Sequence, residues 1–273
     1  MIYFLILNTL DYIKYWVDNM SKMYEEFHKN FEIVIADTPE LLRVVFHVRY
    51  QALCVEKRLP GFDMSLYPDQ LEKDQYDHHS SHALLRYRET GDFIGTVRLI
   101  RCDPMNSGKP FPVELHTLID PALCNIDELS RQHTVEISRL IVLNNFDRRK
   151  SERRNVETRS MDSSTSETDR RYLPNLTLLL VAAAVRMSNQ GNVRNWLSVM
   201  EPALNRLLGY YGSGLTPIGP KVNYLGLRRP YFSNYVDMLD KMYLTHRDAW
   251  EIVTEKGMYC RSPTTTIFVE ERV

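Results

Sequence analysis

The sequence predicts an α/β protein in which a mixed central sheet carries helices on both faces. Runs with the periods of strands and helices follow one another in the order β, α, β, β, β, α, β, α, β, which is typical of this class. Residues 134–143 are apolar on both faces, as a central strand requires, and residues 173–187 form a helical pattern with an almost wholly apolar surface. Such a strand and such a helix belong in the interior of a layered domain.

The chain begins its domain with a short strand and a capped helix. Residues 31–36 are rich in β-formers, and residues 37–40 supply a capping oxygen, a proline for the first helical position and an acid for the first turn. The helix is expected to reach about Val55, with Arg49 near the border between its buried and wet faces. Residues 57–80 have no sustained period and predict a long loop.

A hairpin and the C-terminal half complete the predicted sheet. Residues 82–88 and 93–101 are strand-like, and the turn between them contains Gly91, which tolerates positive φ. Residues 195–200 predict a further strand, and residues 203–211 predict a helix that starts after a proline. Short strand-like pieces follow, with prolines at positions 217, 220 and 230.

Length and composition favour one large domain with two additions. The chain has 273 residues, of which 44% are hydrophobic, so residues 31–273 can build a single core. Residues 1–30 predict an amphipathic helical extension packed on this domain, with contact to a membrane surface as the alternative. Residues 147–171 are almost entirely charged or hydroxyl-bearing, so they predict a mobile charged insertion.

Charge and cysteine content exclude several classes of function. Lys plus Arg (34) nearly cancels Asp plus Glu (35), which does not indicate a nucleic-acid-binding protein. The four cysteines form no Cys-x-x-Cys pair and no regular ladder, so neither a zinc site nor a disulfide framework is predicted, and a reducing cytoplasm is expected. His78, His79 and His82 enter a strand without an acidic ligand pattern, so we expect a solvated loop edge and no metal.

Charged residues interrupt the apolar pattern at four places. An unpaired charge in such a run costs several kcal/mol, so each is expected to have a partner or a task, and together they suggest one polar site. The four motifs are Arg49-Tyr50 in the helix, Glu72-x-Asp74-x-Tyr76-Asp77 in the loop, Gly95-Thr96-x-Arg98-Leu99 in one strand and Glu136-x-Ser138-Arg139 in another.

These motifs, in this order, resemble those of the acyl-homoserine-lactone (autoinducer) synthases of the GNAT superfamily. The runs Cys54-Val55-Glu56, Met200-Glu201-Pro202-Ala203-Leu204 and Pro217-Ile218-Gly219-Pro220 further resemble the exosortase/PEP-CTERM-associated acyltransferases, which are related to long-chain N-acyl amino acid synthases. The resemblance implies a GNAT-like fold and an acyltransferase. Autoinducer synthases carry an aromatic residue and a tryptophan where this chain has Leu53 and Leu59, which argues against a homoserine-lactone product.

The chemistry of amide formation suggests roles for the charged residues. Glu136 is our choice for the base that takes the proton of the acceptor amine, and backbone N–H groups where the sheet splays could stabilise the thioester oxygen. Arg98 or Arg139 could hold an acceptor carboxylate bidentately. The remaining candidate substrate-binding residues are Asp74 and Asp77, which would pair with Arg49 and Arg98 and pin the loop, and Ser138, which is not expected to be a nucleophile.

Two structural questions stay open at this point. Glu136 and Arg139 are three residues apart and would face opposite sides of a regular strand, so either a bulge intervenes or Arg139 has a structural role. The arginines and aspartates could also form a buried ion-pair network that only anchors the loop, and Glu136 could be no more than an acid at a strand edge.

The donor is expected to be an acyl carrier protein thioester, with no bound cofactor. The glycine-rich pyrophosphate loop of ordinary acetyl-CoA enzymes is missing after Leu143, and a phosphopantetheine arm does not need it. A basic run could meet an acidic carrier protein; it consists of Arg148, Arg149, Lys150, Arg153 and Arg154. The acceptor would be an amino acid or similar small amine. The alternatives are an acyl-CoA donor, an acetyl-CoA-dependent N-acetyltransferase and a non-catalytic acyl-binding or sensing module.

Overall fold

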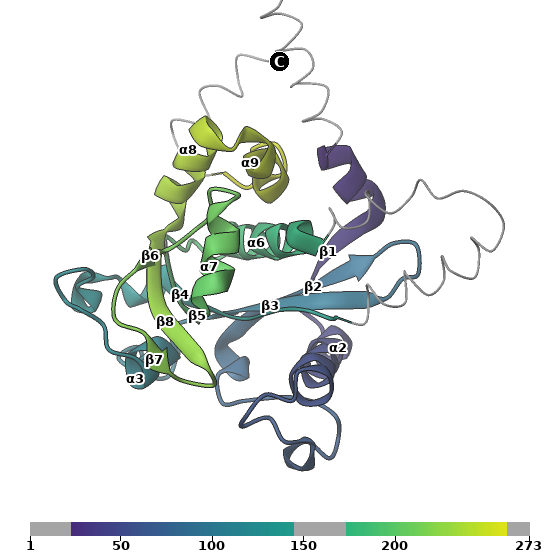
Figure 1. The fold of residues 1–273 in the computed structure, drawn as a ribbon, viewed down its shortest axis with the longest axis horizontal. Helices are drawn as coiled ribbons and strands as arrows, with labels where there is room; N and C mark the ends of the chain where they lie inside the picture. The colour runs from purple at the N-terminus through teal and green to yellow at the C-terminus, as the bar shows by residue number, and fades with distance from the viewer. Residues whose placement is uncertain (1–22, 145–172, 261–273) are drawn as a thin grey trace, which may run out of the picture.

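A mixed sheet organises the computed structural model, which describes residues 23–144 and 173–260 (Figure 1). In this part of the chain the sheet has eight strands in the order β1-β2-β3-β4-β5-β8-β6, with β7 paired to β8, and only β4 and β5 are parallel. The strands are β1 (Phe31–Ile35), β2 (Ser80–Tyr87), β3 (Phe93–Ile100), β4 (Thr134–Val142), β5 (Asn195–Met200), β6 (Thr216–Pro217), β7 (Val222–Asn223) and β8 (Leu227–Asn234). The predicted mixed sheet is confirmed.

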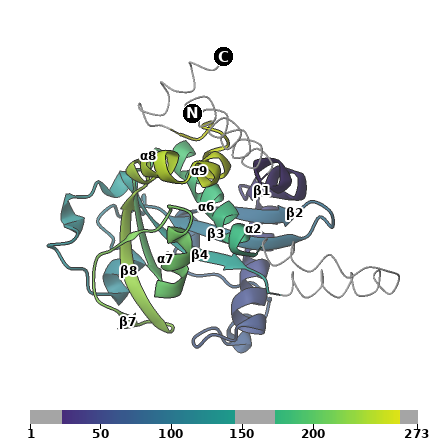
Figure 2. The same cartoon turned by 45° about the horizontal axis from the view of Figure 1, so that its top comes forward.

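Helices cover both faces of this sheet, as the sequence predicts (Figures 1 and 2). On one face α6 (Leu173–Gln190) packs across β1 to β4, and α9 (Arg247–Thr254) packs on α6. On the other face α2 (Pro39–Tyr50) contacts β2 and β3, and α3 (Pro112–His116) contacts β5. The helix α7 (Pro202–Gly209) follows β5, and α8 (Tyr235–Thr245) follows β8.

The core explains why α6 is apolar on every side. Leu176, Leu178 and Leu180 are fully buried, because α6 lies between the sheet and the C-terminal helices. A helix that is hydrophobic all round is a buried helix. Among the described residues no helix has the length and hydrophobicity needed to cross a membrane.

The N-terminus of α2 has the cap that the sequence predicts. The Thr38 Oγ1 accepts a hydrogen bond from the Leu41 N–H at 3.3 Å, and Pro39 occupies the first turn. At its other end α2 continues as a π-helical segment, η1 (Gln51–Glu56), so the helical run reaches the predicted position. The expectation for Arg49 is wrong: its side chain is fully buried, because the loop that follows η1 folds over it and supplies carboxylates.

The C-terminal helices are the main elements that the sequence analysis leaves unassigned. A signal for α8 is nevertheless present, since the Asn234 side chain caps its N-terminus and Tyr235, Met238, Leu239 and Met242 recur at helical spacing on its buried side. The predicted insertion at 147–171 and most of the predicted N-terminal helix lie outside the described residues; residues 23–30 of that segment are helical.

A β-bulge in β4 explains how Glu136 and Arg139, three residues apart, can face the same side of the sheet. Thr96 pairs with Ile141, but Arg98 pairs with Ser138, so one extra residue of β4 lies opposite Val97. Arg139 at this point has a positive φ of 50°. A bulge of this kind restarts the alternation of side chains, so Glu136 and Arg139 can serve the same side of the sheet.

Gly95 is required beside the bulge. A Cβ at this position would lie 2.7 Å from the carbonyl oxygen of Ile141 on the neighbouring strand, a contact that real Cβ atoms do not make. The glycine of the Gly95-Thr96-x-Arg98 motif is thus explained by the close approach of β3 and β4.

Candidate active site

The strands β4 and β5 separate part of the way along their length and leave a cavity between them. Their parallel pairing covers only Thr134–Ile137 on β4 and Asn195–Ser198 on β5, after which β5 continues its pairing with β8 alone. A cavity of about 410 Å³ opens at this point and is lined by β4 from Glu136 to Val142. Backbone groups of β4 beyond Ile137 therefore face this cavity in place of a neighbouring strand.

The cavity has an apolar wall and a polar wall. Part of the apolar wall belongs to one hydrophobic cluster of the η1 segment, the following loop, β4 and the turn before β8; the residues that this cluster shares with the cavity are Leu53, Leu59, Phe62, Ile141 and Leu225. The polar wall includes the predicted site residues Asp74, Arg98, Glu136, Ser138 and Arg139. It also includes Ser198 of β5 and two tyrosines that the sequence analysis did not select for the site, Tyr76 and Tyr224. An apolar tail and a polar head can therefore be bound in one cavity.

Glu136 is the acid of this site whose pKa is raised. Its carboxylate is buried, and Oε2 accepts a hydrogen bond from the Val113 N–H of α3 at 2.8 Å. Burial raises the pKa of Glu136 to about 7, although the Val113 N–H and the charge of Arg98 act in the opposite direction. A carboxyl group with this pKa can both accept and release a proton near neutral pH.

The loop between η1 and β2 is tied to the sheet by three carboxylates and three arginines. Arg49 of α2 donates from Nε to Glu72, and its two terminal nitrogens donate to the Asp77 carboxylate at 2.7 and 3.2 Å. The Asp77 carboxylate also accepts the backbone N–H of Asp74 at 2.8 Å, which closes the turn. The helix and the loop are thus held together by bidentate ion pairs.

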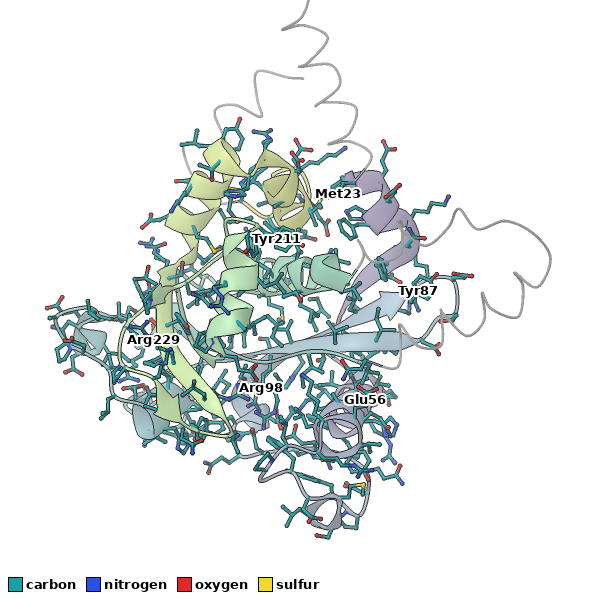
Figure 3. The ribbon with its side chains drawn as sticks, in the orientation of Figure 1. Met23, Glu56, Tyr87, Arg98, Tyr211 and Arg229 are labelled. Atoms are coloured by element: carbon teal, nitrogen blue, oxygen red, sulfur yellow. The ribbon has the colours of Figure 1, made fainter. Side chains whose placement is uncertain are left out.

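Arg98 of β3 lies near the middle of the molecule, where the sheet meets this loop (Figure 3). Its Nη1 and Nη2 donate to the two oxygens of Asp74 at 2.6 and 2.9 Å, and Nη1 also donates to Asp77 at 2.7 Å. Its Nε donates to the Ser138 Oγ of β4 at 2.9 Å. All three nitrogens of the Arg98 guanidinium are thus engaged within the protein.

Arg139, at the bulge, joins the same network from β4. It donates to the Glu72 carboxylate at 2.8 and 3.2 Å and to the Asp74 Oδ2 at 3.1 Å. Burial alone would raise the pKa of Glu72, but Arg139 and Arg49 hold it at about 2. Glu72 was part of a sequence motif but was not selected as a site residue; its position between Arg49 and Arg139 makes it central to the network.

The two arginines expected to hold an acceptor carboxylate already have partners within the protein. Arg98 donates to Asp74, Asp77 and Ser138, so binding an acceptor bidentately would require it to exchange one of these partners. Arg139 is likewise shared between Glu72 and Asp74. The network has no net charge, so its direct effect is to fix the loop and to place Ser138 and Tyr76 beside the cavity.

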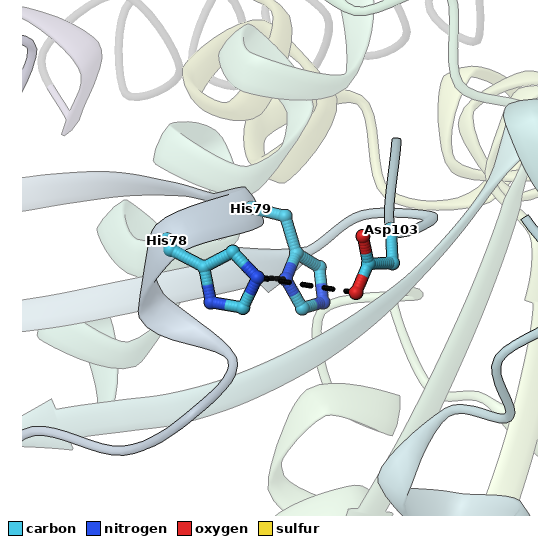
Figure 4. A group of neighbouring side chains, drawn as sticks. All are labelled: His78, His79 and Asp103. Atoms are coloured by element: carbon cyan, nitrogen blue, oxygen red, sulfur yellow. Dashed lines mark hydrogen bonds and ion pairs between the residues drawn. The ribbon is translucent and has the colours of Figure 1, made fainter. Parts of the chain in front are cut away.

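The three histidines at the start of β2 do not share one environment. His82 is buried and its Nε2 lies 3.7 Å from the Asp77 Oδ1, so the expectation of a solvated edge is wrong for this residue. Burial lowers the pKa of His82 to about 4, against the charge of Asp77, and keeps the ring neutral. His78 and His79 are nearer the surface, and the structure places an acid, Asp103, beside them (Figure 4).

Comparison with known proteins agrees with this geometry. Residues 48–156, which contain all the site residues predicted from the sequence, match the family model described as an acetyltransferase (GNAT) domain. No curated protein sequence matches the chain significantly. The resemblance to the exosortase-associated acyltransferases stays a prediction.

Several solved structures share the fold at low sequence identity. The CoA-dependent acyl-homoserine lactone synthase BjaI, with SAM and isopentyl-CoA, has a TM-score of 0.52 and 17% identity, covering 85% of this chain and 90% of that one. TofI, in a ternary complex with an inhibitor and MTA, has a TM-score of 0.50 and 18% identity, covering 80% of this chain and 99% of that one. The matched domain and these structures identify the architecture as a GNAT fold.

Proposed function

We propose that the protein is an N-acyltransferase that moves a fatty acyl group from a thioester to the amine of an amino acid or a similar small amine, in a reducing compartment such as the cytoplasm. One observation carries this proposal: a buried carboxyl group, Glu136, lines the same cavity as an apolar wall. The cavity volume of about 410 Å³ lies within the range of sites that take drug-sized ligands, which is more than an acetyl group needs.

The reaction assigns the following tasks to the residues of the cavity. The ionised Glu136 takes a proton from the ammonium form of the acceptor, directly or through a water molecule. The free amine attacks the thioester carbon, the C–N bond forms and the C–S bond breaks; the proton that the new amide nitrogen loses goes to the sulfur, which leaves as a thiol. The proposal assigns stabilisation of the negative charge that develops on the carbonyl oxygen to backbone N–H groups of β4 beyond Ile137, where the pairing with β5 has ended.

The apolar wall is suited to the acyl chain. Leu53, Leu59 and Phe62 line one side of the cavity, and burial of each methylene group against such a surface contributes about 0.8 kcal/mol. A chain of several carbons would therefore bind here with a substantial preference over a two-carbon group. The polar wall at Glu136 would then receive the amine.

The proposed donor is an acyl carrier protein thioester. The sequence after Leu143 offers no glycine-rich loop for a pyrophosphate, which favours a donor that lacks the adenosine diphosphate part of coenzyme A. BjaI, which has a similar fold, is CoA-dependent, so acyl-CoA is the alternative donor to test.

The decisive experiment measures product formation. Purified enzyme is given acyl carrier protein or coenzyme A thioesters of two to sixteen carbons together with a panel of amino acids and S-adenosylmethionine, and the products are identified by mass spectrometry. We expect a long-chain N-acyl amine that Glu136→Gln fails to form. An N-acetyl product alone would favour an acetyltransferase, which the matched domain description also suggests. Tight binding of acyl thioester with no product from any amine would favour a non-catalytic sensing module.

A further inference from the structure

His78, His79 and Asp103 form a group of metal-ligating side chains that the proposed acyl transfer does not use. None of the three lines the cavity beside Glu136. His78 and His79 belong to the short helix η3 (Asp77–His79), and Asp103 follows β3. Figure 4 shows the two imidazole rings and the carboxylate converging from these two segments. One ligand atom of each residue lies within 4.8 Å of the other two.

These distances are close to those of a metal site. The His79 Nδ1 lies 3.0 Å from the His78 Nε2, and that nitrogen lies 3.9 Å from the Asp103 Oδ2. A point shared by three atoms that are no more than 4.8 Å apart lies at most about 2.8 Å from each of them, whereas zinc takes nitrogen and oxygen ligands at about 2.0–2.2 Å. If each ligand atom moves by less than about 1 Å, all three can reach bonding distance of one ion.

The main chain holds the two segments in register. The Arg101 N–H donates to the His79 carbonyl at 3.1 Å, which fixes the end of β3 against η3. The Asp103 carboxylate is buried and anchored through Oδ1 by the Met105 N–H at 3.0 Å. A site whose ligands are placed in this way does not have to order a loop when it binds its ion.

The present partner of the carboxylate is itself a cation. The Lys109 Nζ lies 3.2 Å from the Asp103 Oδ2, so the position beside this oxygen already attracts positive charge.

We propose that His78, His79 and Asp103 bind a divalent transition-metal ion, with Zn²⁺ as the representative ion, in competition with the Lys109 ammonium group. Two imidazoles and a carboxylate are a ligand set that zinc accepts, and a water molecule can complete the coordination. The ion would link η3 to the segment after β3. Because η3 begins with Asp77, the link would stabilise the same turn that meets Arg49 and Arg98.

The experiment measures Zn²⁺ binding to protein without a histidine tag, by competition with a chromophoric chelator. We expect one ion per chain, and an increase of several degrees in the melting temperature at saturating Zn²⁺. His78→Ala should weaken binding by at least about tenfold, and Asp103→Asn should do the same. His47→Ala removes an exposed histidine outside the group and is the matched control, expected to leave the affinity within about twofold.

Lys109→Met supplies a test in the opposite direction. This change removes the competing cation, so it should tighten Zn²⁺ binding, a result that damage to the fold would not produce. The proposal is overturned if His78→Ala and Asp103→Asn bind Zn²⁺ as the unaltered protein does, or if Lys109→Met binds no more tightly. Failure of the unaltered protein to take any Zn²⁺ from the chelator would overturn the proposal as well.

Discussion

Arg98 and Asp77 are joined by a 2.7 Å ion pair, and the same carboxylate oxygen of Asp77 also accepts from Arg49 at 2.7 Å. Asp77 thus links a β-strand and a helix that are not adjacent in sequence. The two guanidinium groups lower its pKa well below the ordinary range, although burial acts in the opposite direction. The position of the loop beside the cavity depends on this shared carboxylate.

The pairing predicts strong energetic coupling between the two residues. Arg98→Ala or Asp77→Ala alone should lower the free energy of unfolding by roughly 3–5 kcal/mol, because each removes one charge from a buried network that is otherwise neutral. The double variant should be less damaged than the sum of the two changes. Chemical denaturation of all four proteins gives the coupling energy, which should be about 1–3 kcal/mol.

A surface pair provides the control for this cycle. Arg86 and Glu32 also form an ion pair, but their side chains are 40% and 30% exposed, so their coupling should be about 0–1 kcal/mol. Strictly additive effects of Arg98→Ala and Asp77→Ala would show that the contact carries no coupling.

Glu136→Gln is predicted to reduce activity and to change the pH dependence of stability. Loss of a general base typically lowers the rate by about a hundredfold or more. The pKa of Glu136 is raised to about 7 in the folded protein, so its contribution to stability is present below pH 4.5 and is lost as the pH rises through 7. In Glu136→Gln the free energy of unfolding should not fall in this way as the pH rises. Denaturant unfolding at a series of pH values between 4.5 and 8 measures the difference.

The control for this prediction is Glu128→Gln, which alters an exposed acid that does not line the cavity. It should leave both activity and the pH profile nearly unchanged. Turnover of Glu136→Gln at the rate of the unaltered enzyme would rule out a role for this carboxylate in proton transfer.

Glu72 is predicted to make the protein less stable in acid, whereas Glu136 is predicted to make it less stable as the pH rises. Its pKa is held at about 2, so the stability that it contributes is present above pH 4.5 and is lost as the pH falls toward 2. This shift corresponds to a contribution on the order of 3 kcal/mol at neutral pH. Glu72→Gln should be less stable at pH 7 and should lose less stability on acidification, as measured by denaturation at a series of pH values. An unchanged slope would contradict the assigned ion pairs.

The apolar wall predicts control over chain length. Leu59→Trp adds bulk to the cavity, and each methylene group that loses its contact should cost about 0.8 kcal/mol, or about fourfold in kcat/KM. Kinetics with acyl thioesters of increasing length should therefore show a shorter optimum. Leu66→Trp is the matched control, because Leu66 is 62% exposed and does not line the cavity. If both variants had the same optimal chain length, the acyl chain would not bind against Leu59.

The basic run after β4 predicts how the donor is recognised. Replacing Arg148, Arg149, Lys150, Arg153 and Arg154 together by Gln should raise the donor KM and leave kcat nearly unchanged, because surface charges steer encounter and do not take part in the chemistry. The effect should shrink at high salt. Equal use of acyl-CoA and carrier-bound acyl groups, without salt dependence, would favour coenzyme A as the donor.

The sequence predicts most of the elements and the pairing of Asp74 and Asp77 with Arg49 and Arg98, but not the details of how the strands meet. The strand β4 and the helix α6 were predictable because their burial leaves a continuous apolar pattern. The bulge at Arg139 was only one of two alternatives left open by the sequence, since an extra residue in a strand has no compositional signal when the residue is not glycine. Asp103 could not be assigned to His78 and His79, because their proximity depends on how the end of β3 meets η3.

Because the arginine–carboxylate network is buried, salt should affect the binding of a charged donor much more than it affects the loop that this network holds. Exposed charges are screened within about 10 Å at 0.1 M salt, whereas buried pairs such as Arg49 with Asp77 are screened much less. Raising the ionic strength should therefore weaken encounter with a charged donor while the loop beside the cavity keeps its place. Salt can then serve as a selective probe of donor docking, which an exposed network would not permit.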